Sequence, residues 1–138
     1  MREHDIYRLI AQYLQVKYPD VIYRFDLAAD LKLTIGQARK HKTLHPHRGY
    51  PDLFIAEIRP HWGDISFNTE YHGLYLEIKK DGTRLKKKNG EWATPHIAEQ
   101  AEMLEKLEKR GYWAEFAVGI DEALEIIDEY LGRRKKEV

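Results

Sequence analysis

The residues of this chain best suited to chemistry are two carboxylates and a lysine, placed at two short apolar runs. Asp52 opens the apolar run 53–56, and Glu77 and Lys79 lie inside the run 74–79. A strand alternates its faces, so Glu77 and Lys79 should point the same way. Two carboxylates and a lysine at neighbouring strand ends can hold a hard divalent cation beside an amine that stabilises charge or moves a proton. That chemistry suits the hydrolysis of a phosphodiester.

Both carboxylates also have simpler explanations. Asp52 follows Pro51 and could be an ordinary turn residue, because aspartate is common in turns. Glu77 would be a buried charge if its strand were covered on both faces, and such a charge is costly unless it is paired or binds metal. Alternatively, Glu77 and Lys79 form an ion pair on an exposed sheet surface. The sequence alone leaves these alternatives open.

Two further polar residues fall on the apolar stripes of predicted helices. Gln100 lies three residues after Ile97, so it shares the buried stripe and needs a partner there. That partner is either a backbone carbonyl or the lysine, a metal-bound water or a substrate phosphate. Glu3 lies three residues before Ile6 and could reach the metal, or it could be a first-turn acid stabilised by the helix dipole. Asp5 is a second candidate for the same role.

The remaining reactive side chains favour no other chemistry. The chain has no cysteine, which removes disulfides, thiolate zinc sites and cysteine nucleophiles. Its single serine, Ser66, lies outside any nucleophile-elbow pattern. His45 and His47 suggest zinc, but no third or fourth ligand stands at motif spacing. Phosphate contact or solvent exposure is therefore the favoured interpretation of these histidines.

The charges are unevenly spread along a chain whose formal net charge is zero. Segment 79–88 carries six bases and one acid, whereas segment 95–131 carries ten acids and three bases. A neutral protein can still present a basic face to a polyanion, although most such runs are simply solvated. Nearby aromatic residues could stack on an unpaired base or could pack in the core; they are Tyr50, Trp62 and Trp92.

Helices and strands alternate around these residues, which predicts an α/β domain with a central mixed sheet flanked by helices. The hydrophobic periodicity and the proline and glycine positions predict helices over 2–18, 34–42, 95–110 and 121–131. They predict strands over 21–27, 52–58, 74–80 and 112–118. Loops are predicted over 45–50 and 59–72, and the basic tail 132–138 is predicted to fray.

The length and hydropathy of the chain are those of a single globular domain. A length of 138 residues fits one domain, 1–138, with enough chain to bury a core. No apolar stretch approaches the roughly 20 residues needed to span a bilayer, and no signal-peptide pattern is present at the start. We therefore expect the chain to remain in the compartment in which it is made, with no membrane partner.

Together, Gly49-Tyr50-Pro51-Asp52, Glu77-Ile78-Lys79 and Gln100 resemble the motifs of the PD-(D/E)XK nuclease superfamily. Within it, the chain looks most similar to the VRR-NUC (virus-type replication-repair nuclease) domain in its standalone phage or bacterial form. Asp52 and Glu77 are 25 residues apart, which leaves room for a strand, a loop and a second strand. The similarity extends over nearly the whole chain and includes segments 26–27, 33–38 and 96–100.

The resemblance implies a restriction-endonuclease-like core and a nuclease that depends on Mg²⁺ or Mn²⁺. By that analogy the metal ligands are Asp52, Glu77, Glu3 and the backbone carbonyl of Ile78. Lys79 would orient or help activate the attacking water, and Gln100 would support the site. The expected DNA contacts are Arg48, Tyr50, Lys80, Arg84, Lys86, Lys87 and Lys88.

The favoured function is that of a DNA endonuclease selective for branched substrates such as Holliday junctions or flaps. Its expected setting is replication, recombination or repair in the cytoplasm of a bacterial or phage-infected cell. We expect a homodimer, because a two-fold junction offers two equivalent cuts. The alternatives are a nucleic-acid-binding module that needs a partner for cleavage, and a metal-dependent hydrolase of small phosphorylated molecules.

Overall fold

The computed structural model of the chain describes residues 1–26, 32–60 and 70–136. Four helices and six strands alternate along these residues. The helices are α1 (Glu3–Lys17), α2 (Ile35–Leu44), α3 (Pro95–Glu108) and α4 (Gly119–Lys136). The strands are β1 (Tyr23–Phe25), β2 (Leu53–Ile55), β3 (Arg59–Pro60), β4 (Glu70–Tyr71), β5 (Leu74–Lys79) and β6 (Trp113–Val118).

The central sheet is mixed, with the strand order β1-β2-β5-β6. β1 pairs antiparallel with β2, and β2 pairs antiparallel with β5 through Leu53↔Leu76. β5 and β6 are parallel, as the crossover through α3 requires. The antiparallel pairing therefore brings the start of β2 and the end of β5 to the same end of the sheet.

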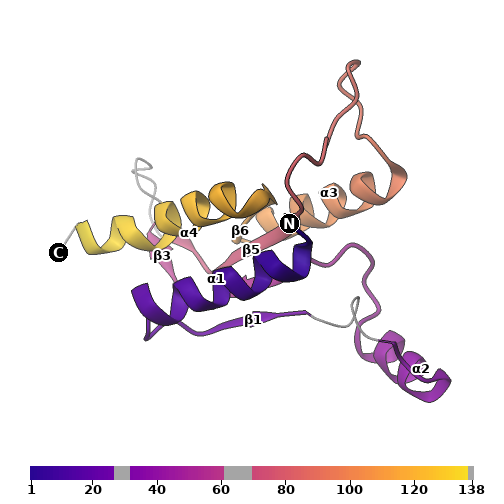
Figure 1. Cartoon of the computed structure of the whole chain (residues 1–138), viewed down its shortest axis with the longest axis horizontal. Helices are drawn as coiled ribbons and strands as arrows, with labels where there is room; N and C mark the ends of the chain where they lie inside the picture. Colours follow the sequence, from indigo (N-terminus) through magenta and orange to yellow (C-terminus); the bar gives the residue numbers. More distant parts are fainter. Residues whose placement is uncertain (27–31, 61–69, 137–138) are drawn as a thin grey trace.

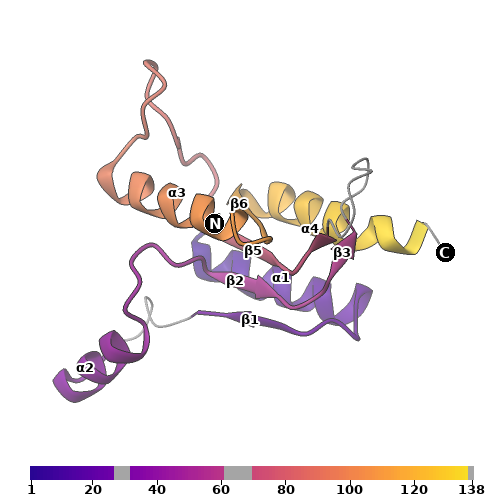
Figure 2. The same cartoon turned by 180° about the vertical axis from the view of Figure 1, so that it is seen from behind.

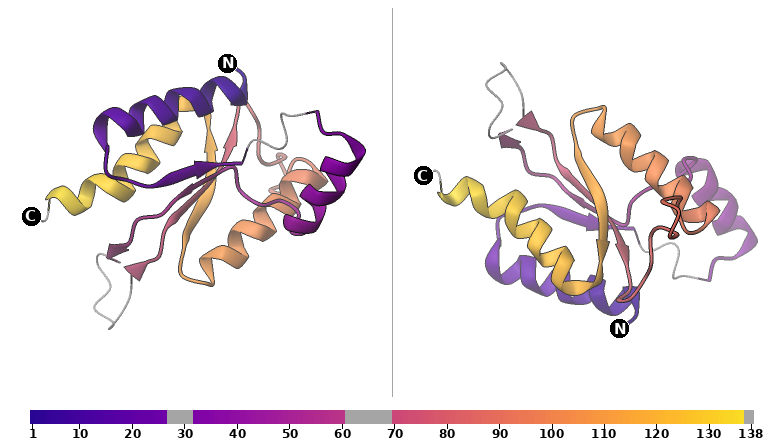
Figure 3. Two further views of the ribbon diagram at one scale, coloured as in Figure 1. Left: turned by 90° about the horizontal axis from the view of Figure 1, so that it is seen from below. Right: turned by 90° about the horizontal axis from the view of Figure 1, so that it is seen from above.

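Helices cover both faces of the sheet, as the views along it show (Figure 3). α1 and α4 pack on one face, where the apolar stripe of α1 is buried together with Leu76 and Ile78. α3 packs on the other face, against Tyr75 and Ala114. Every residue of β5 is buried, because this strand lies inside the sheet and is covered on both sides. The expected α/β domain with a central mixed sheet flanked by helices is confirmed.

Two segments stand away from this layered body. α2 and the basic segment between β5 and α3 both project from it, at the same end of the molecule (Figures 1 and 2). α2 has no buried residue, although its start is well capped by Thr34 and Gln37. The basic segment is closed by an antiparallel bridge between Lys86 and Trp92.

The structure corrects several predicted boundaries. β2 covers three residues, not the predicted 52–58, because segment 56–58 finds no ladder partner along β5. The predicted loop 59–72 holds β3 and β4, which pair with each other; its residues 61–69 lie outside the described part of the chain. α2 ends two residues later than predicted, and α4 starts at Gly119 and continues to Lys136, where a frayed tail from residue 132 was predicted. Leu27 of the predicted strand 21–27 also lies outside the described residues.

Candidate nuclease site

Asp52 and Glu77 lie side by side at one end of the two inner strands of the central sheet. Asp52 directly precedes β2, and because Leu53 pairs with Leu76, one further step of the ladder sets Asp52 opposite Glu77. The backbone N–H of Ile78 donates to Oδ2 of Asp52 at 2.8 Å, which fixes that carboxylate against the end of β5. The sheet register thus assembles two carboxylates that are 25 residues apart in the sequence.

Glu77 is a buried carboxylate that the described residues only partly satisfy. Its side chain is 3% exposed, and the described part of the chain offers no hydrogen-bond partner to its buried Oε1. Burial, followed by the hydrogen bond and the negative charge of Asp52, raises the pKa of Glu77 to about 11, while Lys79 acts in the opposite direction. The alternative of an ion pair on an exposed sheet surface is therefore wrong. In this buried position the ionised form of Glu77 is unfavourable unless a cation binds next to it.

Lys79 and Gln100 approach from the α3 side of the sheet. Lys79 lies two residues after Glu77, so the two side chains share one face of β5, and Lys79 is 8% exposed. Gln100 is buried on the inner stripe of α3, and its Oε1 also finds no partner among the described residues. A buried polar oxygen without a partner costs free energy, and such atoms are typical of sites that receive a ligand or ion.

A glycine lets the loop before Asp52 approach α3 closely. Gly49 has a φ of 72°, a left-handed conformation that other residues rarely adopt. A Cβ at this position would lie 2.9 Å from the carbonyl oxygen of Glu99 and 3.1 Å from the Cα of Gln100. The glycine in the Gly-Tyr-Pro-Asp motif therefore allows the loop that carries Asp52 to pack against the helix that carries Gln100.

The proline of the same motif affects the backbone of Ile78. Since the N–H of Ile78 points towards Asp52, its carbonyl oxygen points to the same side of β5. One more step of the ladder would set Pro51 opposite Ile78, and proline has no N–H to donate to that oxygen. The carbonyl oxygen of Ile78 thus lies on the Asp52 side of β5, opposite a residue that has no backbone N–H to donate to it.

α1 supplies a third carboxylate and a phenol. Glu3 is half-buried, and its charge contributes to raising the pKa of Glu77, whereas Asp5 is held by Arg2 and Arg8. The carboxylate oxygens of Glu3, Asp52 and Glu77 do not all lie within 4.8 Å of one another in the described structure. Of the two acids considered on this helix, the structure thus sets Glu3 in electrostatic contact with the site.

Tyr7 is a site residue that the sequence analysis missed. Burial raises its pKa, helped by the charge of Asp52, a hydrogen bond to Asp52 and the charges of Glu77 and Glu3. Its phenol therefore stays protonated and can donate to the Asp52 carboxylate. The sequence held a signal for it, because Tyr7 follows Glu3 by four residues and so lies on the same face of the helix.

The residues predicted to contact DNA lie at the surface around this end of the sheet. Arg48, Lys80, Arg84, Lys86, Lys87 and Lys88 are exposed. Tyr50 is 44% exposed, and its hydroxyl hydrogen-bonds with that of Tyr75 at 2.7 Å. Trp92 packs against Phe116 with its ring under the Lys86 ammonium, so it is partly committed to holding the basic segment. Trp62 lies outside the described residues.

A second group of ligand-type side chains was not predicted. Asp26, at the end of β1, meets His41 and His45 of the α2 region, and their ligand atoms lie within 4.8 Å of one another. In the sequence, His45 and His47 have no further ligand at motif spacing. The spacing of His41 and His45, four residues apart on a helix, was the signal that could have identified the pair, whereas Asp26 could be found only from the fold.

The chain is similar in structure to a solved protein over most of its length. No family model matches the sequence, and no curated protein matches it. A solved structure described as a VRR_NUC domain protein aligns with a TM-score of 0.64 and 27% sequence identity. The alignment covers 96% of this chain and 89% of the other. In the described part of this chain, no helix is both long and apolar enough to cross a membrane.

Proposed function

We propose that this chain hydrolyses phosphodiester bonds in DNA with Mg²⁺ or Mn²⁺. It resembles the VRR-NUC domain over nearly its whole length and has the fold of that nuclease domain. The observation that carries the proposal is the buried Glu77 carboxylate beside Asp52. Two acids held this close in a buried place are destabilising by themselves. A divalent cation converts the same arrangement into a favourable one.

The donor set fits a hard divalent ion. Asp52, Glu77 and the carbonyl of Ile78 are all oxygen donors, and Mg²⁺ and Mn²⁺ prefer oxygen ligands. The buried Oε1 of Glu77 has no partner among the described residues, as expected of an atom that ligates an ion. Glu3 would complete the negative charge around the ion, either directly or through water. When bound, the ion supplies a Lewis acid at the scissile phosphate.

The other residues of the site act on the water and on the phosphate. Lys79 lies on the same face as Glu77, where its amine orients the attacking water and stabilises the charge that develops on the phosphate. Gln100 directs its unsatisfied amide oxygen into the same buried region and supports the lysine or the water. Tyr7 donates to Asp52 and holds that carboxylate in place. Tyr7 is a positioning residue, because it acts through Asp52.

Branched DNA is the substrate class that we propose. α2 and the basic segment project on either side of the end of the molecule at which β2 starts and β5 ends (Figure 1). Both carry exposed bases that contact phosphates without reading base sequence, and two separate projections suit a substrate with more than one arm. We further propose that the chain cuts as a homodimer, because a two-fold junction offers two equivalent scissile bonds.

The proposal is tested by cutting assays on labelled duplex, flap, Y-fork and four-way-junction DNA, with Mg²⁺, Mn²⁺ or EDTA. We expect metal-dependent cutting of a branched substrate. Lys79→Ala should lower the single-turnover rate by about 10²–10³-fold, the usual effect of removing one preorganised charge-stabilising group. Binding of the same DNA should stay within a few fold, since phosphate contacts supply most of the affinity.

Lys106→Ala is the matched control, because Lys106 is an exposed lysine on α3 paired with Glu102 at 3.4 Å. Its rate should equal that of the wild type. Normal cutting by Lys79→Ala would remove this lysine from the mechanism. Binding without cutting on every substrate would instead favour a nucleic-acid-binding module that needs a partner for cleavage.

A further inference from the structure

α2 buries little of its surface against the described part of the chain. Its ten residues include no buried side chain, and its apolar residues Ile35 and Leu44 are 78% and 64% exposed. Isolated helices shorter than about 12–15 residues are marginal in water, and the capping box at Thr34 improves only one end. Tertiary packing normally supplies the missing stability. A different kind of contact is needed to position this helix.

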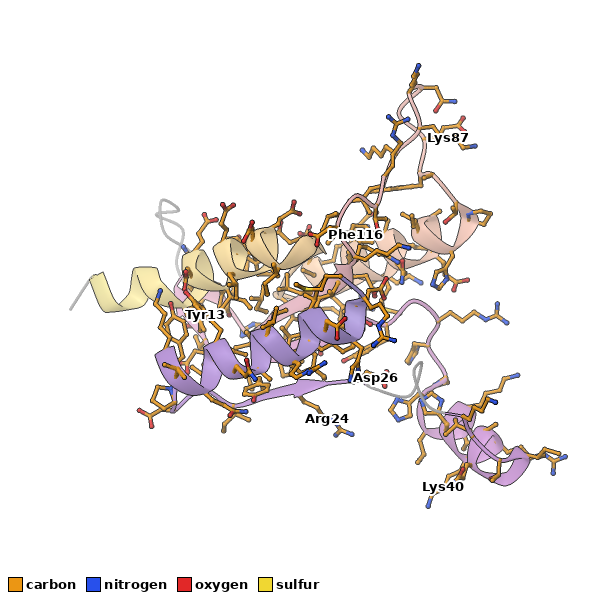
Figure 4. The ribbon with its side chains drawn as sticks, viewed as in Figure 1. Tyr13, Arg24, Asp26, Lys40, Lys87 and Phe116 are labelled. Atoms are coloured by element: carbon orange, nitrogen blue, oxygen red, sulfur yellow. The ribbon has the colours of Figure 1, made fainter. Side chains whose placement is uncertain are left out.

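The contact that the structure offers is between two histidines and an aspartate. His41 and His45 lie one helical turn apart, with parallel rings 4.3 Å apart between centroids. Asp26 lies at the end of β1 nearest α2 (Figure 4), and its carboxylate comes within 4.8 Å of both imidazoles. Asp26 thus directly follows a strand of the sheet, whereas His41 lies on the projecting helix and His45 is its C-terminal cap residue.

The histidine nitrogens have the character of metal ligands. Nε2 of His41 is buried, and the described residues provide it with no hydrogen-bond partner. Two donors on a tetrahedral ion, each about 2.0–2.1 Å from it, are about 3.3 Å apart. The ligand atoms of the three residues lie within 4.8 Å of one another, so each separation would shorten by at most about 1.5 Å to match that spacing. The exposed side chain of His45 can supply this by rotation.

We propose that Asp26, His41 and His45 form a binding site for a transition-metal ion such as Zn²⁺, which fastens α2 to the end of β1. Two imidazoles and one carboxylate suit zinc, whereas Mg²⁺ prefers oxygen ligands and keeps several waters. A water completes a tetrahedral site in the fourth position. This site is separate from the oxygen-ligand site at Asp52 and Glu77, and its chemistry selects a different ion.

Such an ion would order the surroundings of the nuclease site without entering it. The backbone N–H of Asp26 donates to the carbonyl oxygen of Asp52 at 2.8 Å, so the residue that anchors α2 is tied to the residue that opens β2. Arg39, Lys40 and Lys42 are exposed on α2, and Lys40 projects from the helix away from the sheet (Figure 4). The ion would therefore hold a basic helix at a set distance from the carboxylates.

Titration with Co²⁺ and Zn²⁺ tests the site directly, because tetrahedral Co²⁺ absorbs visible light. We expect one equivalent of Co²⁺ to give these bands and Zn²⁺ to displace it. His41→Gln, His45→Gln and Asp26→Asn should each weaken Zn²⁺ binding by at least about 100-fold, since each removes a direct ligand. Hydrogen exchange of the α2 amides should slow on addition of Zn²⁺ in the wild type but not in His45→Gln.

Two controls keep the result specific. His96→Gln removes an exposed histidine from the first turn of α3 and should bind Zn²⁺ as the wild type does. Glu77→Gln alters the proposed nuclease site and should also retain Zn²⁺ binding. Binding lost in Glu77→Gln, binding that survives His41→Gln and His45→Gln, or no binding at 100-fold excess Zn²⁺ over about 10 µM protein would overturn the proposal. None of these outcomes depends on whether the chain cuts DNA.

Discussion

Glu77 shows how a buried carboxylate can oppose the fold that carries it. It lies in the middle of a fully buried strand, where an apolar residue would stabilise the sheet, and Asp52 stands beside it. The carboxylate is therefore a source of instability that is relieved by a proton or by a metal ion. Both forms of relief can be measured through the stability of the protein.

We predict that Glu77→Gln stabilises the metal-free protein at pH 8 and abolishes the stabilisation by Mg²⁺. The folded-state pKa of Glu77 lies at about 11, above its unfolded value near 4.5. The stability that comes from the protonated carboxyl is therefore complete below pH 4.5 and is progressively lost as the pH rises towards 11. The variant carries no such loss, so its melting temperature should exceed that of the wild type at pH 8 and match it below pH 4.5.

Thermal melts in EDTA and in Mg²⁺ at both pH values check this prediction. Each kcal/mol moves the melting temperature by about 4 °C in a chain of this size, so a difference of several degrees is expected at pH 8. Glu102→Gln, which alters a carboxylate that is 68% exposed on α3, is the matched control and should show neither effect. A wild type that melts above Glu77→Gln at pH 8 in EDTA would show that the fold tolerates the charge.

Sequence periodicity located some of the site residues but not all of them. Alternation along a strand placed Glu77 and Lys79 on one face, and helical spacing placed Gln100 on a buried stripe; all three are buried. Tyr7 and Asp26 were missed because their roles depend on contacts with residues far away in the sequence. Arg59, assigned to a loop, is 2% exposed between Tyr71 and Trp113, where cation–π contacts replace water. Periodicity in the sequence predicts which side chains are buried, whereas the residues that contact them across the fold can be identified only from the structure.

At the scale of elements, the segment between β5 and α3 is more ordered than a solvated basic run. Its two sides are joined by backbone hydrogen bonds from Lys87 to Glu91 and from Ala93 to Leu85, each 2.7 Å long. The Lys86 ammonium lies 4.7 Å from the centre of the Trp92 ring, which in turn packs on Phe116 of β6. The charges are therefore presented on a ribbon anchored to the sheet.

We predict that replacing both Lys87 and Lys88 by Ala weakens DNA binding and flattens its salt dependence. Each phosphate contact contributes about −0.9 to the slope of log K against log salt on duplex DNA, so the slope should become shallower by up to about two. Lys86 is left in place because it packs on Trp92, and its loss would disturb the ribbon itself. Binding measured by fluorescence anisotropy at several salt concentrations gives the slope.

The double variant Lys106→Ala with Lys109→Ala removes the same charge from the last turn of α3 and its C-cap, where both lysines pair with glutamates four residues earlier. Its slope should equal that of the wild type. An unchanged slope in the Lys87 and Lys88 variant would mean that the ribbon does not contact phosphates.

Other elements show where prediction from sequence stops. The strong helix signals of α1 and α3 were located to within two residues, because an apolar stripe and a proline at the first helical position are local features. β3 and β4 were missed because two residues each leave no periodicity to detect. The segment that connects them, 61–69, lies outside the described residues.

For the molecule as a whole, the site is assembled from both sides of the sheet. α3 supplies Gln100 on one face, while α1, on the other face, supplies Glu3 and Tyr7 at its first turns. α1 lies along α4 across that face (Figure 3), and the far end of α1 is fastened to α4 by Asp128. The position of the end of α1 that carries Glu3 and Tyr7 therefore depends on a polar cluster at its opposite end.

Asp128 is the centre of that cluster. Its carboxylate accepts hydrogen bonds from the hydroxyls of Tyr13 and Tyr18, both at 2.7 Å, and from Lys17 at 3.0 Å. Partial burial acts to raise the pKa of Asp128, but these hydrogen bonds outweigh it and hold the pKa below its usual value. Its contribution to stability is therefore present above about pH 3.8 and is lost as the pH falls through the lower folded-state value.

We predict that Asp128→Asn lowers the free energy of unfolding by about 1–2 kcal/mol at pH 6, at the low end for charged hydrogen bonds because the carboxylate is partly exposed. Urea titrations at pH 6 and at pH 3 should show a difference that shrinks as the wild-type carboxylate becomes protonated. Glu125→Gln, at an exposed carboxylate one turn earlier on α4, should leave the unfolding midpoint unchanged at both pH values. Because α1 carries Tyr7 and Glu3, Asp128→Asn should also lose cutting activity at a lower temperature than the wild type. If activity persisted to the wild-type temperature while stability fell, the position of α1 would be set by the sheet and not by this cluster.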